Sequence, residues 1–138
     1  EDITNAINKN NIEIKENIKI SEFIFNVPLV MSAADIIIAR SGAITLAELA
    51  VKGLPSILIP SPNVTDNHQY YNAKAFADAG AAILINEEDL TGEMLYKTIT
   101  DITKDENKLV EMSKNASKLA KPEALKNIVD NIEILLSA

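Results

Sequence analysis

The sequence of 138 residues predicts an α/β fold in which helices cover both faces of a parallel sheet. Short apolar runs over 35–39, 56–59 and 82–86 alternate with segments over 43–52 and 68–79, in which apolar residues recur every three or four positions. Strands that alternate with helices imply right-handed βαβ crossovers, which build a Rossmann-like sheet. Such a sheet is buried on both faces, because the crossover helices pack against it.

The first third of the chain is predicted to contain a helix, a strand and a short second helix. The first helix is expected over 2–10, and the Ile and Phe residues of KISEFIF indicate a strand over 18–24. Pro28 suits the first turn of a helix over 28–34, because the N–H that proline lacks would have no partner there. Together with the three runs above, this makes four expected strands.

A complete βαβ unit is expected within 34–62. Its first strand ends at an Arg-Ser-Gly turn over 40–42, its helix stops at Gly-Leu-Pro over 53–55, and its second strand follows directly. Ligands of such units bind beyond the carboxyl ends of the strands. Gly80 is placed to end the next helix, in the position after the last turn that favours glycine.

Three further helices are expected over 87–105, 106–120 and 122–136, because apolar residues there recur at three- and four-residue spacing. Pro122 is placed at the first position of the last helix. No repeat or low-complexity tract divides the sequence, so 1–138 is expected to be one domain whose helical last third wraps the sheet.

The composition excludes several classes of site. The sequence has no cysteine and one histidine, His68, so neither a thiolate metal site nor a poly-histidine centre is expected. A net charge of −7 argues against a broad surface for nucleic acid or anionic lipid. No apolar run has membrane-spanning length, and no signal-peptide pattern opens the chain. Because the sequence begins with helix-like residues and no methionine, an N-terminally truncated domain is expected.

The first candidate site is the segment that joins a strand to a helix, Ser41-Gly42-Ala43-Ile44-Thr45. Glycine lets the backbone approach a ligand, and the free N–H groups of a first helical turn favour an anion such as phosphate. Thr45 adds a hydroxyl, and Glu48 lies three residues further along the same face, within reach of sugar hydroxyls. Two alternatives stay open: Ser41 as a helix N-cap, and Glu48 as a solvated side chain.

Arg40, next to this segment, has a simpler interpretation, which is a surface or inter-domain ion pair.

A second polar cluster is predicted to lie at the same edge of the sheet, because it follows the next strand along the chain. Its Asn, Gln and His side chains each offer a donor and an acceptor to sugar hydroxyls. As alternatives, the acidic residue is only a helix N-cap and the tyrosines are core aromatics. The residues are Asp66, Asn67, His68, Gln69, Tyr70, Tyr71 and Asn72.

His68 is a possible catalytic base, but no serine, cysteine or carboxylate can be assigned as its triad partner from the sequence. Binding is therefore favoured over catalysis for this cluster. A third element, the loop over 23–27, carries apolar residues and free backbone groups that would suit a flat base. Ordinary core packing of Phe23 and Ile24 is the alternative for that loop.

The two segments ADIIIARSGAITLAELAVKGLPSILIPSP and TDNHQYYNAKAFADAGAAILI together resemble the C-terminal half of the MurG family of bacterial N-acetylglucosaminyltransferases. The resemblance covers about residues 18–135. It implies the C-terminal half of a GT-B glycosyltransferase, a single donor domain that binds the nucleotide sugar UDP-N-acetylglucosamine (UDP-GlcNAc). The resemblance implies that this domain requires no cofactor and has no metal ligands.

Position by position, the resemblance assigns the loop residues Ile24 and Val27 to the uracil. Ser41, Gly42, Ala43 and Thr45 would lie at the diphosphate, Ile44 beside the nucleoside, and Glu48 at the ribose hydroxyls. Gln69 would hold hydroxyls of the sugar ring, and His68 stands where some relatives carry a second glutamine. Asn72 and Asp66 are further candidates.

The resemblance also implies a function for the longer protein. Members of the family transfer N-acetylglucosamine to lipid I, invert the anomeric centre and make lipid II for peptidoglycan, the polymer that maintains cell shape and serves cell division. They act peripherally at the cytoplasmic face of the bacterial membrane, which they contact through an N-terminal acceptor domain. That domain and the family's glycine-rich loop are not in this sequence, so the fragment is expected to be soluble and inactive alone.

The sequence alone leaves two alternatives open. The chain is the donor domain of another GT-B hexosyltransferase, such as a glycolipid synthase, or it is a non-catalytic interaction module with a polar rim.

Overall fold

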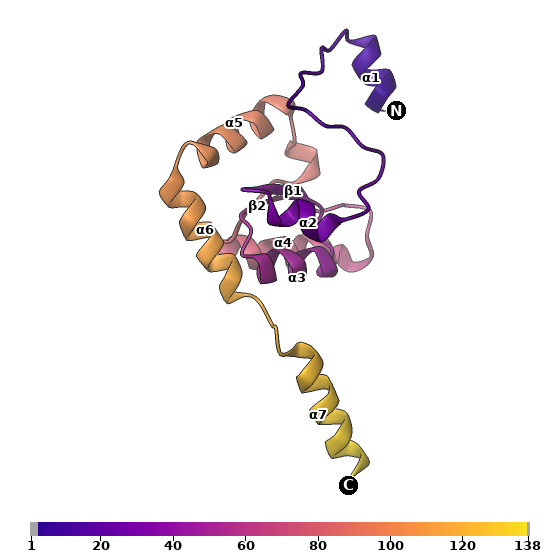
Figure 1. The fold of residues 1–138 in the computed structure, drawn as a ribbon, viewed down its shortest axis with the longest axis vertical. Coiled ribbons are helices and arrows are strands. Elements are labelled where there is room, and N and C mark those ends of the chain that lie inside the picture. The colour runs from indigo at the N-terminus through magenta and orange to yellow at the C-terminus, as the bar shows by residue number, and fades with distance from the viewer. Residues whose placement is uncertain (1–2, 138) are drawn as a thin grey trace.

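The structure is a computed structural model that describes residues 3–137, apart from the side chain of Thr4. Its centre is a parallel sheet of three strands in the order β1 (Ile37–Ala39), β2 (Ser56–Leu58) and β3 (Ala82–Leu84), as Figure 1 shows in part. Ile38 pairs with Ile57, and Ile57 pairs with Ile83, so the three strands are in register.

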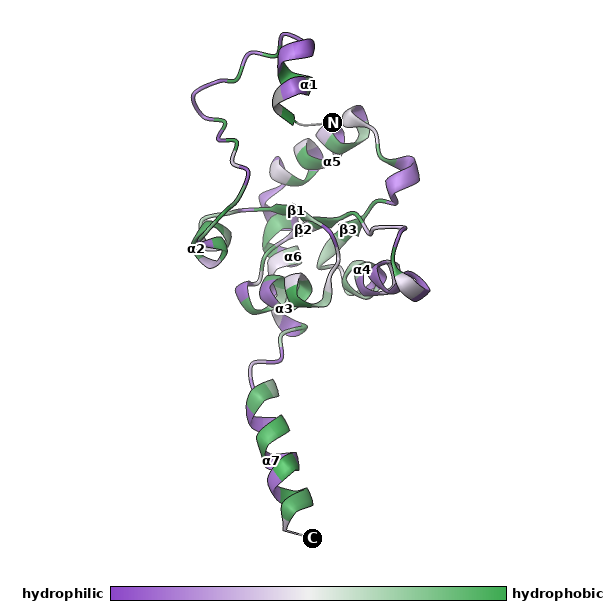
Figure 2. Cartoon of the chain, turned by 90° about the vertical axis from the view of Figure 1, so that its right-hand side faces the viewer, coloured by the Kyte–Doolittle hydropathy of each residue, from purple (hydrophilic) through white to green (hydrophobic). Residues whose placement is uncertain are grey.

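Helices precede, connect and follow these strands. Their bounds are α1 (Ile3–Lys9), α2 (Val27–Ser32), α3 (Ala43–Lys52), α4 (His68–Asp78), α5 (Gly92–Thr103), α6 (Glu106–Lys118) and α7 (Ala124–Leu136), with short 3-10 turns η1 (Thr65–Asn67) and η2 (Glu87–Asp89). In Figure 2, α3 and α4 lie on one side of the sheet and α5 on the other. The predicted parallel sheet with helices on both faces is therefore confirmed.

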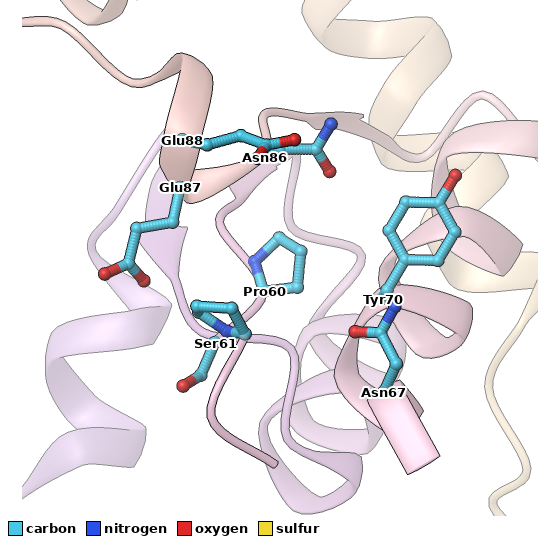
Figure 3. Close-up of a pocket in the computed structure, with 8 residues that line it drawn as sticks. Pro60, Ser61, Asn67, Tyr70, Asn86, Glu87 and Glu88 are labelled. Carbon is cyan, nitrogen blue, oxygen red and sulfur yellow. The ribbon is translucent and has the colours of Figure 1, made fainter. Parts of the chain in front are cut away.

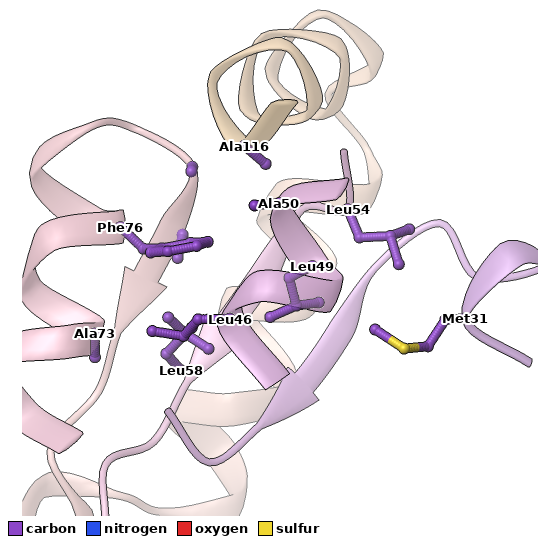
Figure 4. Close-up of a cluster of buried hydrophobic side chains, with 11 residues drawn as sticks. Met31, Leu46, Leu49, Ala50, Leu54, Leu58, Ala73, Phe76 and Ala116 are labelled. Carbon is purple, nitrogen blue, oxygen red and sulfur yellow. The ribbon is translucent and has the colours of Figure 1, made fainter. Parts of the chain in front are cut away.

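Two apolar clusters hold these layers together. Successive residues of a strand point to opposite faces, so Leu58 enters the cluster under α3 and α4, whereas Ile57 enters the cluster under α5. Figure 4 shows the first cluster, with Leu49 of α3 at its centre and Ala116 of α6 closing one side. The turn between β1 and α3 is thus held by the packing of both elements against the first cluster.

The predicted strand over 18–24 is wrong. No residue between Asn11 and Asn26 belongs to a helix or strand, and Ile18, Ile20 and Phe23 are 49%, 49% and 66% exposed. The apolar pattern of this segment is that of a strand, but no described strand lies beside it to accept its backbone hydrogen bonds. The described sheet has three strands rather than four.

Helix ends follow the glycine and proline positions, with one exception. Gly80 has a φ of 71° just after α4, as expected, and Gly53 has a φ of 61° after α3. Pro28 lies in the first turn of α2. Pro122 is not the first residue of α7, which begins at Ala124, because the preceding residues form a turn closed by the Ala124 N–H and the Lys121 carbonyl.

The last third of the chain forms the three expected helices, but they do not all wrap the sheet. α5 and α6 contribute Ile102 and Met112 to the core. By contrast, α7 projects away from the other elements in Figures 1 and 2, and apolar side chains such as Leu125 and Leu135 are exposed. The expected helix over 2–10 is present as α1, while Asp2 lies outside the described residues.

Ser56, at the start of the central strand, is fully buried, and its hydroxyl has no hydrogen-bond partner among the described residues. A buried polar group without a partner costs about 1–3 kcal/mol, so Ser56→Ala is expected to raise the free energy of unfolding by about 1 kcal/mol in urea titration. Ser117→Ala, an exposed serine on α6, is the control and is expected to change it by less than about 0.5 kcal/mol. A less stable Ser56→Ala protein would contradict this prediction.

Candidate functional site

The turn between β1 and α3 presents an uncapped helix N-terminus. Gly42 is the N-cap residue, with φ −66° and ψ 146°, and no side chain hydrogen-bonds to the first turn. The alternative that Ser41 caps this helix is therefore wrong. The first N–H groups of a helix have no intrahelical partner, and with the helix dipole they form a site for an anion. The ten residues of α3 are long enough to maintain such a dipole.

Ser41 joins this turn to α4 instead. Its side chain is fully buried, and its Oγ donates a hydrogen bond of 2.7 Å to the Gln69 carbonyl. Asn72 Nδ2 donates to the Ser41 carbonyl at 3.1 Å, and Gln69 Oε1 accepts from the Ser61 N–H at 2.9 Å. These bonds bring together three segments far apart in the sequence: the turn after β1, the loop after β2 and the start of α4.

Removing the Ser41 hydroxyl tests this network. Ser41→Ala is expected to lower the free energy of unfolding by about 0.5–1.5 kcal/mol, because it removes the hydrogen bond that the buried Ser41 hydroxyl donates to the Gln69 carbonyl. Urea titration measures the change. Ser21→Ala is a matched control, because that hydroxyl also donates to a carbonyl, Phe23 O, but is exposed. If both substitutions changed the free energy of unfolding by the same small amount, the Ser41 hydrogen bond would not contribute to stability.

A cavity of about 370 Å³ lies between α2, the edge of β1 and α3. We call it the α2–α3 cavity. It brings together Ile24 and Val27, from the loop and helix before the sheet, with Thr45 and Glu48 of α3. The other lining residues are apolar: Val30, Met31, Ala34, Ile36, Ile37 and Ala39. An apolar hollow with a hydroxyl and a carboxylate at its α3 side suits a flat ring attached to a hydroxylated sugar.

The remaining predicted residues lie around this cavity rather than in it. Ala43 and Ile44 are exposed on the first turn of α3, and Ile44 lines a neighbouring groove with Val51 and Pro28. Gln69 and Asn72 are half-buried and use Oε1 and Nδ2 in the network above. Their other amide atoms form no hydrogen bond with any described residue.

The start of α4 is exposed and has an unusual backbone. His68 Nδ1 lies 2.9 Å from the Thr65 carbonyl, so the ring is bound to its own loop. Asp66 and Asn67 have φ values of 53° and 50°, in the left-handed region that Asp and Asn tolerate better than most residues. Asp66 is not the N-cap of α4. Asn67 takes that place without a side-chain hydrogen bond. Farther along α4, Asp78 raises the pKa of Lys74 through a hydrogen bond and its charge.

Arg40 connects the carboxyl ends of all three strands. Its Nη1 donates to the carbonyls of Ile59 and Pro60, each at 3.2 Å, and forms an ion pair with Glu87 of η2. The ion pair expected for Arg40 from the sequence is confirmed, and its partner lies within the chain. The loops that follow β1, β2 and β3 are thereby held at one edge of the sheet.

A second hollow, the α4–η2 cavity, lies at this edge and measures about 410 Å³. Its lining residues are Pro60, Ser61, Pro62, Asn67, Tyr70, Asn86, Glu87 and Glu88. In Figure 3, Asn67 and Tyr70 stand on one side, Glu87 and Glu88 on the other, and Asn86 lies between them at the top. No pattern in the sequence had pointed to Asn86, Glu87 or Glu88. Their position directly after a buried strand was the available indication.

Among residues 3–137, no group of three or more His, Asp or Glu side chains is arranged to hold a metal ion. Within the same range, none of the helices is both long and apolar enough to cross a membrane.

The model of the glycosyltransferase family 28 C-terminal domain matches residues 1–128. The chain belongs to this family. The fold agrees, because a family 28 relative of known structure, described as the crystal structure of Acinetobacter baumannii MurG, superposes with a TM-score of 0.81 and 34% identity. The match covers 94% of this chain and 38% of the MurG chain. The Rossmann-like fold of a GT-B C-terminal half, expected from the sequence, is thereby confirmed.

Relatives of the same family carry one name, UDP-N-acetylglucosamine--N-acetylmuramyl-(pentapeptide) pyrophosphoryl-undecaprenol N-acetylglucosamine transferase. The protein from Desulforamulus reducens is 44% identical over 138 residues, which are 99% of this chain and 37% of the relative. The one from Halalkalibacterium halodurans is 49% identical over 113 residues, 82% of this chain and 31% of the relative. The family 28 chain therefore spans about a third of the length of these relatives.

Proposed function

We propose that this chain is the donor-binding part of a glycosyltransferase that transfers N-acetylglucosamine from UDP-GlcNAc to lipid I and so makes lipid II for peptidoglycan. The names of the relatives support this reaction. The observation that carries the proposal for this chain is the α2–α3 cavity, which joins Ile24, Val27, Thr45 and Glu48 beside an uncapped helix N-terminus.

In this proposal the nucleotide runs along α3. The uracil lies against Ile24 and Val27, and the carboxylate of Glu48 accepts hydrogen bonds from the ribose hydroxyls. The diphosphate lies at the first turn, where the N–H groups of Gly42 to Thr45 and the Thr45 hydroxyl face it. Because the Ser41 hydroxyl is directed into the protein, Ser41 contributes through its backbone.

The sugar extends from the diphosphate towards α4. Gln69 Nε2 and Asn72 Oδ1 have no internal partner among the described residues and are free to bind ring hydroxyls. The exposed ring of His68 lies next to them in sequence and adds a further contact. We assign these three residues to binding and none of them to proton transfer.

The chain stabilises the leaving group in the proposed reaction. A hydroxyl of the acceptor attacks the anomeric carbon from the face opposite the diphosphate, the bond from that carbon to the phosphate oxygen breaks, and the configuration inverts. The attacking hydroxyl loses its proton to a base in the rest of the longer protein. The helix N-terminus holds the negative charge that develops on UDP, a role that such dipoles perform without reorganisation.

The rest of the longer protein would supply the acceptor site and the contact with the cytoplasmic face of the membrane. Because these parts lie outside the chain, the isolated chain is a binding domain without transferase activity. Transfer of N-acetylglucosamine by the chain alone would contradict it.

Titration of backbone amide shifts with UDP-GlcNAc, UDP-glucose, UDP and ADP tests the proposed function. We expect uridine-selective shifts at Ile24, Thr45 and Glu48, with further shifts at Gln69 that are larger for UDP-GlcNAc than for UDP-glucose. Equal responses to the two UDP sugars at Gln69 would favour another hexosyltransferase of the same architecture. Equal or absent responses to all four ligands would contradict a donor site and favour an interaction module.

A further inference from the structure

Gln69 presents a hydrogen-bond donor whose orientation is set by its neighbours. Its Oε1 accepts from the Ser61 N–H at 2.9 Å, and its backbone carbonyl accepts from the Ser41 hydroxyl at 2.7 Å. A backbone N–H can only donate, so the contact with Ser61 determines which end of the Gln69 amide is the oxygen. The Nε2 group, on the other branch of the amide, has no partner among the described residues. It is left to donate to an oxygen of a ligand.

The peptide group between Pro60 and Ser61 links Gln69 to Arg40. The N–H of this group donates to Gln69, and its carbonyl accepts from Arg40 Nη1 at 3.2 Å. The peptide bond is trans, so its N–H and C=O lie in one plane and point in opposite directions. Arg40 and Gln69 therefore bind opposite edges of the same planar group. A rotation of this plane would move the N–H that holds the Gln69 amide.

The guanidinium of Arg40 is itself held in place. The same Nη1 donates to the Ile59 carbonyl at 3.2 Å and pairs with Glu87 of η2. Among the described residues, the carbonyls of Ile59 and Pro60 have no other hydrogen-bond donor. Pro60 is buried, so its carbonyl needs the partner that Arg40 supplies. Hydrogen bonds in a chain also polarise one another, so a charged donor at this carbonyl strengthens the bond from the Ser61 N–H to Gln69.

We infer that Arg40 is a positioning residue for recognition of the donor sugar: through the Pro60–Ser61 peptide group it orients the Gln69 amide and does not contact the ligand. The inference rests on the proposed function, which assigns Gln69 Nε2 to a sugar hydroxyl. Its effect is confined to the sugar end of the donor. The nucleotide end is assigned to residues such as Thr45 and Glu48, neither of which forms a hydrogen bond with Arg40.

Isothermal titration calorimetry with UDP and with UDP-GlcNAc tests the inference. Arg40→Met removes the guanidinium and keeps an unbranched side chain. We expect it to bind UDP within about twofold of the wild type and UDP-GlcNAc about threefold to tenfold more weakly, the effect of losing one hydrogen bond. Arg40→Lys keeps a charged donor and should recover part of the preference for UDP-GlcNAc. Lys97→Met removes the cation of an exposed ion pair on α5 and should bind both ligands as the wild type does.

A double-mutant cycle separates positioning from an independent contribution. Gln69→Ala should lose at least as much of the preference for UDP-GlcNAc as Arg40→Met does. The variant that carries both substitutions should lose no more than Gln69→Ala, because Arg40 acts through Gln69. Additive losses would overturn the inference, since Arg40 would then act on the ligand by another route. An equal loss of affinity for UDP and UDP-GlcNAc in Arg40→Met would also overturn it.

A measurement without ligand distinguishes the failure of this inference from the failure of the proposed function. In Arg40→Met, the Ser61 amide proton is expected to exchange with solvent about threefold to tenfold faster, and the Gln69 side-chain NH₂ resonances should shift. Lys97→Met should leave both signals unchanged. Unchanged Ser61 and Gln69 signals in Arg40→Met would overturn the inference whatever the chain binds. Absence of a UDP response at Thr45 and Glu48 in the wild type would instead overturn the proposed function.

Discussion

Glu48→Ala is expected to weaken UDP binding by about 1–3 kcal/mol, the range for removing hydrogen bonds to a charged group. Such a loss raises the dissociation constant about fivefold to 150-fold. The carboxylate lines the α2–α3 cavity beside Thr45, and it is half-buried, so water competes for it less than on an open helix face. Isothermal titration calorimetry with UDP measures the change.

Two controls isolate the carboxylate. Glu48→Gln keeps a hydrogen-bond acceptor but removes the charge, and it should fall between the wild type and Glu48→Ala. Glu111→Ala, on the exposed surface of α6, should bind UDP as the wild type does. If Glu48→Ala bound UDP with unchanged affinity, Glu48 would be a solvated helix residue and not a ribose ligand.

Leu49→Ala is expected to lower the free energy of unfolding by about 2–5 kcal/mol, the cost of removing a large buried side chain and leaving a cavity. Leu49 is fully buried and lies at the centre of the cluster in Figure 4, where α3 packs against the sheet and α6. A domain of this size has a total stability of about 5–15 kcal/mol. The substitution therefore removes a large part of what holds the site-bearing helix in place.

Urea denaturation measures the effect of Leu49→Ala, with Val51→Ala as the matched control. Val51 is on the same helix but 62% exposed, so its truncation should change the stability by about 0.5 kcal/mol or less. Comparable effects at the two positions would contradict the placement of α3.

Local patterns were sufficient to predict the centre of the fold. The strands of the βαβ unit are short and mainly apolar, and the two crossover helices, α3 and α4, are each followed by a glycine with a positive φ, Gly53 and Gly80. Such features depend on neighbouring residues only. The segment over 18–24 has an equally good strand pattern, but a strand also needs a partner, and pairing is a non-local property that its own residues do not encode.

Some features of the candidate site could likewise be predicted from local sequence, and others could not. The start of a helix after the Ser-Gly turn and the position of Glu48 one helical turn from Thr45 follow from local spacing, whereas the sequence left open whether Ser41 caps that helix. Ile24 and Val27 were placed with them by family resemblance, and the structure brings all four to one cavity. Their contacts with UDP stay a prediction. The Ser41–Gln69 bond was not predictable from spacing, because it joins residues 28 positions apart in the sequence.

The α4–η2 cavity was missed for a physical reason. Its residues come from the loop after β2, the start of α4 and the segment after β3, and the sequence pattern indicated a site only at the start of α4. Arg40, from the end of β1, pairs with Glu87 and with no other carboxylate among the described residues, and this contact joins residues 47 positions apart in the sequence.

A crystal structure of the chain with UDP-GlcNAc tests the central claim, a donor site along α3, most directly. We expect the uracil in the α2–α3 cavity against Ile24 and Val27, with the ribose hydroxyls at Glu48. The diphosphate should lie at the N–H groups that follow Gly42. A nucleotide in the α4–η2 cavity, or one whose diphosphate makes no contact with the first turn of α3, would contradict the account.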